Sequence, residues 1–407
     1  MTKKQVGWIL IGLLLVVSRL YIWQAKPTDF SQITAVYMPY AHLWAEGLKP
    51  YLEQWYEYPP ATIPLFYLPH WIDLKTMTFS WHLNYGLAYR GLIFWVDMGL
   101  VGLIIVWLKK LKVKAPIIWG GLIYYALATA KAHDFIYDAM DLVFVAAVVI
   151  GITAPKLWGR AGQFIEWLGF FLATALKLIN APLLVVYAVM ERSNRKKLLI
   201  NLFAAGLIVW LLPLLIFRSA LAVMLVYHGQ RGLQVESVPA QIVLLINRFS
   251  HTENFEQKYQ SITLIGPISE QVTQIFNWLL PIMVISYLIW GTRAAVKIRL
   301  SDQHQARVAL TLVYFFGFML VGKVLSTPYL LWQIPLLALY PFKSLKQQLA
   351  MTGPALIMIA ISMTPIKNTN LGWIDVHLLI GWGRSVIIAY LLVASIFLVN
   401  QLKAQSK

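Results

Sequence analysis

Long apolar runs recur along the whole of this 407-residue chain and constrain its fold more than any other feature. Inside hydrocarbon, every backbone polar group needs a partner within the protein, so such runs predict helices that cross a membrane. They lie at roughly Val6–Trp23, Tyr85–Leu108, Ala115–Ala130, Asp141–Ala154, Ala161–Lys177, Leu178–Met190, Leu198–Phe217, Ile268–Trp290, Ala306–Val321, Val324–Tyr340, Leu349–Pro365 and Val376–Gln401. We predict an all-α polytopic transmembrane bundle of about 12 spans. Residues 161–190 form either two short helices or one long or broken helix.

The composition excludes several other classes of protein. Hydrophobic residues make up 59% of the chain and charged residues 13%, which does not describe the surface of a soluble domain. The formal net charge is +17, but the basic residues lie in short clusters at the ends of apolar runs. They are therefore topology signals rather than a nucleic-acid surface. Because the chain has no cysteine, disulfides and thiolate metal sites are excluded.

The basic clusters fall on one side of the membrane if the N-terminus is cytoplasmic. They are Lys109–Lys112, Lys156–Arg160, Arg192–Lys197, Arg293–Arg299, Lys343–Lys346 and the C-terminal tail. We predict a single integral membrane domain, residues 1–407, in the cell membrane with both termini cytoplasmic. Two large extracytoplasmic loops then cover residues 25–84 and 218–266. The first loop holds two predicted interfacial helices, near Thr34–Glu46 and Ala61–Ile72, since the latter is too short and proline-rich to cross.

The first loop contains more aromatic and acidic residues than a simple connection needs. Asp29 follows the first span closely, so it lies at the outer membrane boundary. A carboxylate there is partly desolvated, and its pKa can be adjusted for proton abstraction. The alternative is a solvated aspartate, or a cap for the helix that begins near Ser31. The sequence alone favours neither interpretation.

Four stretches resemble a known family. They are Asp29-Phe30 with Tyr37, Trp44–Gly47, Pro50-Tyr51 and Glu57–Pro60; Ala175–Lys177 with Pro182; His228–Ser237; and Lys323–Trp332. Together they are similar to glycosyltransferase family 87, the polyprenyl-phosphate-mannose-dependent mannosyltransferases. This chain has Ser326-Thr327-Pro328-Tyr329 where members usually read Ser-Pro-Gln-Tyr. The resemblance implies a GT-C fold, a sugar donor on a polyprenyl phosphate, and Asp29 as the general base.

Candidate substrate-binding residues follow from the charge that such a reaction develops. The departing polyprenyl phosphate becomes more negative, so cations or hydrogen-bond donors must face it. The candidates for that role are Lys177, His228, Arg231 and Lys323. The other candidate substrate-binding residues lie in the same stretches: Tyr37, Glu57, Tyr58, Glu236 and Tyr329.

Each cation also has a structural interpretation. Lys177 and Lys323 suit lysines that extend from helix ends toward the interface, which is the commoner role at such positions. Arg231 and Glu236 are close enough in sequence to pair in a surface loop. The glycines beside Arg231 favour a functional role, because they allow backbone to approach a phosphate. For His228, taken by itself, a structural role is favoured.

Further acidic residues lie between or within the predicted spans. Asp134, Asp138 and Asp141 have the i, i+4, i+7 spacing of one helix face, near His133, and are compatible with a cation site. Helix capping and an exposed acidic turn are the favoured alternatives, and we predict neither a metal nor a cofactor. Asp97 and Glu166 lie inside spans, where a charge needs a partner. Arg19 and Arg384 are the candidate partners.

The predicted function is a membrane glycosyltransferase. It would transfer a hexose, mannose by the resemblance, from a polyprenyl-phosphate donor to a lipid-linked or cell-envelope acceptor on the extracytoplasmic face. Its partners would be this donor, a lipid or glycan acceptor and the membrane, with no nucleic acid. The alternatives are a secondary transporter or lipid flippase, for which about 12 helices are a frequent layout, and a non-catalytic component of an envelope complex. A transporter would show an internal sequence repeat between its two halves, and no such repeat is evident.

Overall fold

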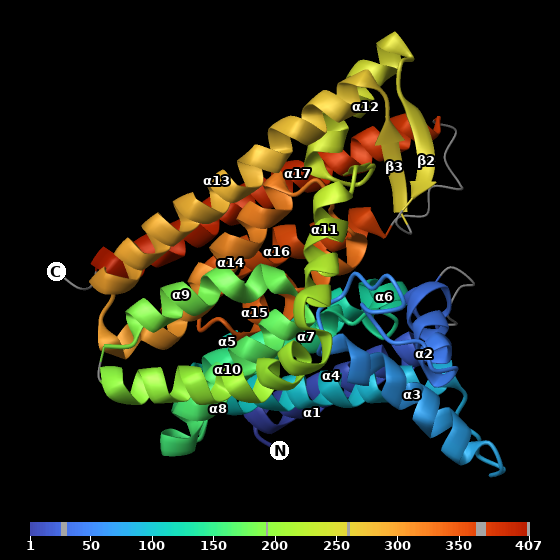
Figure 1. The fold of residues 1–407 in the computed structure, drawn as a ribbon. Helices are drawn as coiled ribbons and strands as arrows, with labels where there is room; N and C mark the ends of the chain where they lie inside the picture. Colours follow the sequence, from blue (N-terminus) through green and yellow to red (C-terminus); the bar gives the residue numbers. More distant parts are fainter. Residues whose placement is uncertain (26–30, 193, 259–260, 364–371, 405–407) are drawn as a thin grey trace. The chain divides into compact units, whose positions relative to one another are not determined.

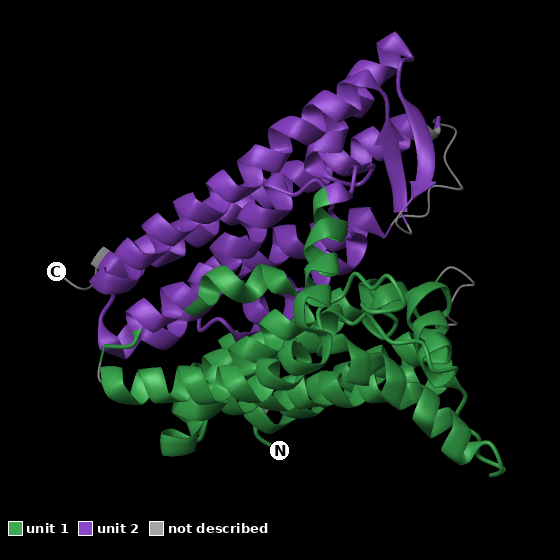
Figure 2. Ribbon diagram, in the orientation of Figure 1, with its two compact units in different colours: residues 1–184, 191–229 green, residues 185–190, 230–407 purple. Residues whose placement is uncertain are grey.

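The computed structural model describes residues 1–25, 31–192, 194–258, 261–363 and 372–404. The chain divides into two compact units (Figure 2). Unit 1 comprises residues 1–184 and 191–229, and unit 2 comprises residues 185–190 and 230–407. The predicted catalytic Asp29 lies outside the described residues.

Unit 1 is a helical bundle with a folded first loop (Figure 1). Its elements are α1 (Lys3–Gln24), the π-helical turn η1 (Ile33–Tyr37), α2 (Met38–Ala45), α3 (Thr62–Thr76), α4 (Tyr85–Lys110), α5 (Ala115–Lys131), α6 (His133–Ile136), α7 (Asp141–Leu157), α8 (Gly159–Leu176), the 3₁₀ turn η2 (Leu178–Asn180), the start of α9 (Ala181–Met190), α10 (Arg195–Phe217), the 3₁₀ turn η3 (Arg218–Leu221) and α11 (Ala222–Gln230). Helices α1 and α5, α4 and α7, α7 and α8, and α8 and α10 pack in pairs. The two helices predicted in the first loop are confirmed as η1–α2 and α3. Their position at the membrane interface stays a prediction.

Helices α7 and α8 form an antiparallel pair whose close approach depends on glycine. A Cβ atom on Gly162 would lie 2.1 Å from the carbonyl oxygen of Ala154, and one on Gly169 would lie 2.9 Å from that of Ala147. Small residues allow helix backbones to approach in this way within membranes. Helix α8 ends at Leu176, and Lys177 has an extended backbone, so residues 161–190 form a broken helix. This outcome was one of the two that the sequence left open.

Unit 2 combines helices with a small sheet. Its elements are the end of α9, β1 (Leu233–Gln234), α12 (Val238–Ser250), β2 (Asn254–Lys258), β3 (Ser261–Ile265), α13 (Pro267–Lys297), the 3₁₀ turn η4 (Leu300–Asp302), α14 (Gln303–Val321), the 3₁₀ turn η5 (Thr327–Leu331), α15 (Gln333–Leu339), α16 (Leu345–Ser362) and α17 (Trp373–Ala404). Helix α17 packs on α12, α14 and α16, and α13 packs on α14. The predicted span Val324–Tyr340 is not one helix. Pro328 and Pro335 lack the N–H that a continuous helix needs, and the segment divides into η5 and α15.

The second predicted loop, residues 218–266, is largely regular structure. It contains α11, α12 and an antiparallel sheet with the strand order β1-β3-β2, an addition to the predicted all-α fold. Leu233 on β1 pairs with Leu264 on β3, and both belong to a buried apolar cluster with residues of α12 and with Leu378 of α17. One face of the sheet is therefore packed against the helices of unit 2.

Within the part of the chain that the structure describes, six helical segments are long and apolar enough to cross a membrane. They are Lys4–Gln24, Tyr85–Lys110, Arg195–Gln230, Pro267–Lys297, Leu300–Val321 and Ile374–Lys403. Several expose large apolar side chains to their surroundings: Phe203 is 70% exposed and Trp278 is 75% exposed. A soluble protein rarely presents so much apolar surface, whereas lipid accommodates it. These segments confirm the helical bundle of a membrane protein, and the full number of crossings stays a prediction.

Candidate functional site

Unit 1 contains a buried polar cluster where the first loop meets α4 and α7. Arg90, on the first turns of α4, donates hydrogen bonds to the carbonyl oxygens of Ile22, at 2.8 Å, and of Ala25. Its Nε lies 3.5 Å from Oδ1 of Asp138, and both side chains are almost fully buried. An arginine at a helix start can hold two chain segments in this way because its planar head offers several donors. Arg90 thus fastens the end of α1 to the turn before α7.

Asp138 is the carboxylic acid of this cluster whose pKa is shifted by burial. Burial raises the pKa of Asp138 to about 6, against the lowering effect of the Arg90 charge. The neighbouring Tyr37 hydroxyl accepts a hydrogen bond from the Met140 N–H at 3.3 Å and donates one to Gln32 at 3.3 Å. Burial raises the pKa of Tyr37, and the charges of Asp141 and Asp138 add to that effect. Tyr37 therefore stays protonated and serves as a hydrogen-bond donor.

A second buried ion pair lies close by. The Lys177 ammonium lies 3.1 Å from Oδ1 of Asp141, and the two side chains are 16% and 5% exposed. Lys177 stands where α8 ends and Asp141 is the first residue of α7, so the pair joins the ends of two packed helices. The Ala61 N–H also donates to the Ala175 carbonyl at 3.0 Å, which ties the first loop to the same end of α8.

The first loop is held by its own acids and aromatics. The Tyr40 hydroxyl donates to a carboxylate oxygen of Glu57, which is 5% exposed, and the Tyr51 hydroxyl donates to the carbonyl of Tyr58. The Tyr37 ring stacks on Phe66, with centroids 4.1 Å apart, and meets Tyr58 edge-on at 6.2 Å. Burial raises the pKa of Tyr40, and the Glu57 charge raises it further. Tyr37, Glu57 and Tyr58 thus form one packed network.

The structure separates the three aspartates whose spacing is compatible with one helix face. Helix α6 ends at Ile136 and α7 begins at Asp141, so Asp134, Asp138 and Asp141 lie on different elements. Each has its own neighbour: Asp134 lies 3.2 Å from His133, Asp138 faces Arg90 and Asp141 faces Lys177. Among the described residues, no group of three or more histidine or acidic side chains is arranged to hold a metal ion.

Unit 2 brings two cations together beside its sheet. The Arg231 guanidinium donates to the Ser261 hydroxyl at 3.2 Å, and the Lys323 ammonium donates to the Asn277 side-chain oxygen at 2.9 Å. Burial lowers the pKa of Lys323, and the positive charge of Arg231 lowers it further. Two cations whose charges influence each other form a positive surface that an anion would stabilise.

Glu236 does not pair with Arg231 among the described residues. Its carboxylate accepts from the Thr327 hydroxyl at 3.1 Å and from the Gln234 side chain at 3.4 Å. Its backbone carbonyl accepts from Arg384, which lies inside a candidate span of α17. Glu236 therefore joins the second loop to the turn that begins at Thr327. The Gln234 N–H strengthens this link by donating to the Lys323 carbonyl at 3.0 Å.

The predicted site residues fall into two groups. Tyr37, Glu57, Tyr58, Lys177 and His228 belong to unit 1, and Arg231, Glu236, Lys323 and Tyr329 belong to unit 2. His228 lies on α11, where its ring meets Tyr227 edge-on, and Tyr329 stacks on Trp332 with centroids 4.4 Å apart. Within unit 2, Arg231 and Glu236 flank β1 in sequence, and the Lys323 carbonyl accepts from Gln234 of β1. Within unit 1, Lys177 and Tyr37 surround the start of α7.

The charges predicted within spans have the following partners. Arg19 of α1 makes two hydrogen bonds to Asp97 of α4, at 2.8 and 3.0 Å, which confirms that prediction. The hydroxyls of Tyr125 and Tyr137 also donate to Asp97, each at 2.8 Å. Arg384 contacts Glu236 in unit 2, whereas Glu166 lies on α8 in unit 1.

The comparisons with known proteins leave the family open. No protein-family model, curated protein or solved structure matches this chain.

Sequence reasoning missed Arg90 and Asn277 and left Asp138 without its partner. The signal for Arg90 was present, because an arginine inside a predicted span needs a partner as much as Asp97 does. Asn277 gave no such signal, since an amide carries no charge that requires a partner. Only the fold brings it to Lys323, 46 residues away.

Proposed function

We propose that this protein is a membrane glycosyltransferase that uses a sugar carried on a polyprenyl phosphate. It transfers a hexose, with mannose as the first candidate, to a lipid-linked or cell-envelope acceptor on the extracytoplasmic side. Asp29 deprotonates the acceptor hydroxyl as that hydroxyl attacks the anomeric carbon, and the polyprenyl phosphate departs. No nucleotide sugar is available outside the cell, so a lipid-borne donor suits an outward-facing site.

The observation that carries the proposal is the pair of cations in unit 2. Arg231 lowers the pKa of Lys323, so the two charges repel each other when nothing is bound. A phosphate between them removes that repulsion, and its stabilisation grows as the departing phosphate gains charge. The loop is fixed by the bonds of Gln234 to Lys323 and of Glu236 to Thr327, so the cations need little rearrangement to bind.

The first loop supports the other half of the proposal. Ala25 and Gln32, which flank the segment with Asp29, contact Arg90 and Tyr37. These in turn face Asp138 and Met140. A base needs supports of this kind, because a carboxylate must be oriented as well as deprotonated. The exposed apolar helices suit a lipid environment, which is also the environment that a polyprenyl chain requires.

A transfer assay tests this function. The purified protein in liposomes would be given radiolabelled polyprenyl-phosphate mannose or polyprenyl-phosphate glucose, together with a membrane lipid extract as acceptor. We expect label to move to a new product in the wild type, with a loss of at least about 100-fold for Asp29→Asn, the size of effect typical of a general base. Undiminished transfer by Asp29→Asn would exclude Asp29 as the base.

Variants of Arg231 and Lys323, compared with a matched control, test whether these residues bind phosphate. Arg231→Ala and Lys323→Ala are expected to weaken the binding of polyprenyl phosphate, measured as thermal stabilisation of the protein. Arg248→Ala is the control, since Arg248 belongs to the same unit but pairs with Asp375 at 2.6 Å. Equal loss in all three variants would count against a specific phosphate site. Net uptake of labelled donor into sealed vesicles without a glycosidic product would favour the transporter or flippase.

A further inference from the structure

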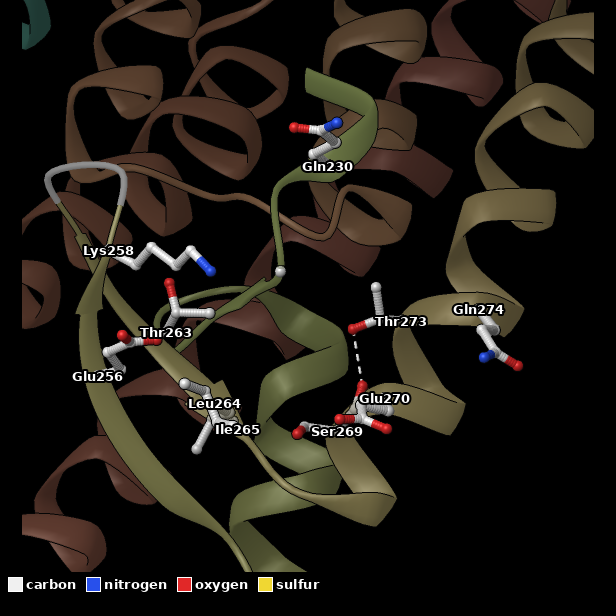
Figure 3. A pocket seen from close by; sticks show the side chains of 11 residues that line it. Gln230, Glu256, Lys258, Thr263, Leu264, Ile265, Ser269, Glu270, Thr273 and Gln274 are labelled. Atoms are coloured by element: carbon white, nitrogen blue, oxygen red, sulfur yellow. Dashed lines mark hydrogen bonds between the residues drawn. The ribbon is translucent and has the colours of Figure 1, made fainter. Parts of the chain in front are cut away.

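Unit 2 contains a hollow of about 370 Å³ between the β2–β3 sheet and the first turns of α13 (Figure 3). Its volume falls within the range of small-molecule sites in proteins. Its lining includes Gln230 and Gly232, which flank Arg231 in the sequence, but neither Arg231 nor Lys323. It is therefore a separate feature from the cation pair.

The sheet forms one wall of the hollow. Side chains alternate along a strand, so Glu256 and Lys258 lie on the same face of β2. In the antiparallel register Glu256 pairs with Thr263 on β3, which places these side chains next to each other. Leu264 points its side chain to the opposite face, into the buried apolar cluster. One face of the sheet is therefore apolar and packs in the core. The other face is polar and lines the hollow.

Helix α13 forms the opposite wall. Glu270, Thr273 and Gln274 are spaced at i, i+3 and i+4, which places them on one face of the helix. Figure 3 shows these three side chains across the hollow from Glu256, Lys258 and Thr263. The Thr273 hydroxyl donates to the Ser269 carbonyl at 2.7 Å, so it presents its acceptor lone pairs to a ligand.

Most of the polar side chains in the hollow are not used by the fold. Gln230, Glu256, Thr263, Glu270 and Gln274 form no side-chain hydrogen bond or ion pair with any other residue that the structure describes. They combine carboxylate and amide acceptors with amide and hydroxyl donors. A ligand with many hydroxyl groups, each both donor and acceptor, matches such a set.

The charge of the hollow argues against an anionic ligand. Two carboxylates, Glu256 and Glu270, face one ammonium, Lys258, which gives a formal charge of −1 in a chain of net charge +17. The N-terminus of α13, where an anion would otherwise bind, is already occupied by the Glu253 carboxylate. The charges therefore favour phosphate binding at Arg231 and Lys323. They favour a neutral ligand in the hollow.

We propose that this hollow binds a neutral sugar unit of a glycan. That the glycan is the acceptor of the transfer rests on the proposed function, whereas the binding of a neutral sugar does not. Hydroxyl groups of the sugar bond to Gln274, Thr263 and the two carboxylates. The C–H face of the ring lies against Ile265, which lines the hollow.

Binding of simple glycosides tests the inference. The full-length protein in lipid nanodiscs would be titrated with methyl α-mannoside, methyl α-glucoside and methyl α-galactoside and followed by saturation-transfer NMR. We expect at least one glycoside to bind, and Thr263→Val and Gln274→Ala to weaken it about threefold to tenfold each, the usual effect of one lost neutral hydrogen bond. Gln271→Ala, an exposed glutamine one turn earlier on α13 that does not line the hollow, is the matched control.

The outcomes separate this inference from the proposed function. Glycoside binding that depends on Gln274 supports the sugar site even if the wild type shows no transferase activity. Absence of binding by all three glycosides overturns it, as does binding that Thr263→Val and Gln274→Ala leave unchanged. Displacement of the glycoside by inorganic phosphate or Ca²⁺, if it depends on Gln274, would also overturn the inference. The hollow would then be an ion-binding site. The thermal unfolding of each variant shows that the fold is intact.

Discussion

At the scale of single residues, buried charges explain most of the polar structure of unit 1. Asp97 accepts hydrogen bonds from Arg19, Tyr125 and Tyr137, and Asp138 faces Arg90. Each pair lies in or beside a predicted span, where an isolated charge is costly. The first pair was predictable because both members are ionisable residues inside apolar runs. The partner of Asp138 was not, because its position depends on a turn that periodicity does not reveal.

Removal of Asp97 should strongly destabilise unit 1. Asp97→Leu leaves Arg19 buried without its carboxylate and removes the acceptor of two tyrosine hydroxyls, at a cost of about 3–5 kcal/mol. The midpoint of thermal unfolding, followed in detergent by the fluorescence of the 17 tryptophans, should fall by several degrees. The double variant Arg19→Met/Asp97→Leu should recover much of the loss. Equal stability of Asp97→Leu and wild type would contradict the assignment.

Asp138 should make stability depend on pH. Its pKa is raised to about 6 from an ordinary value of 3.8, so the fold favours the protonated acid. The stability that this preference contributes is fully present below pH 3.8 and is lost as the pH rises through 6. The shift of about 2 units corresponds to about 3 kcal/mol. Asp138→Asn cannot ionise, so its unfolding midpoint should fall less than that of the wild type between pH 4 and 7.

The control for the Asp138 experiment is Asp134→Asn. The Asp134 side chain is 49% exposed and lies four residues before Asp138, on α6, so this variant should follow the wild-type curve. If both variants change the pH profile equally, the burial of Asp138 is not its cause.

At the scale of elements, the first turn of α13 depends on a residue outside that helix. The Glu253 carboxylate accepts from the N–H groups of Ile268, at 2.9 Å, and Ser269, at 3.0 Å. Gly266 has a φ of +154°, and a Cβ atom there would lie 2.7 Å from that carboxylate. This arrangement sets the angle between β3 and α13, the two walls of the hollow. No helix-start pattern in the sequence indicates it, because Glu253 lies 14 residues before α13 begins.

Loss of this cap should cost stability in a non-additive way. Glu253→Ala should cost about 1–2 kcal/mol, the usual range for a helix cap. Gly266→Ala should cost at least as much, because it displaces the same carboxylate and strains the backbone. The double variant should be no less stable than Gly266→Ala alone, as measured by thermal unfolding. A double variant whose cost equals the sum of the two single costs would show that Gly266 and Glu253 act independently.

At the scale of the whole molecule, the charge distribution predicts a topology that labelling can test directly. The chain has no cysteine, so single-cysteine variants carry no background. A membrane-impermeant maleimide should label Glu46→Cys and Thr252→Cys in intact cells, because both positions are exposed and lie in the predicted outer loops. Lys346→Cys, in a basic cluster, should react only after the membrane is permeabilised. Labelling of all three in intact cells would refute the predicted orientation.

The sequence by itself indicated that lipid surrounds this protein, and it located most of the helices. Apolar runs of sufficient length require helical backbone in lipid, and charged residues inside such runs require partners. The tertiary structure alone decided the partners of Asp138, Asp141 and Lys323, the division of Val324–Tyr340, and the sheet whose polar face lines the hollow. These features depend on contacts between distant segments, and local periodicity carries no information about which segments meet.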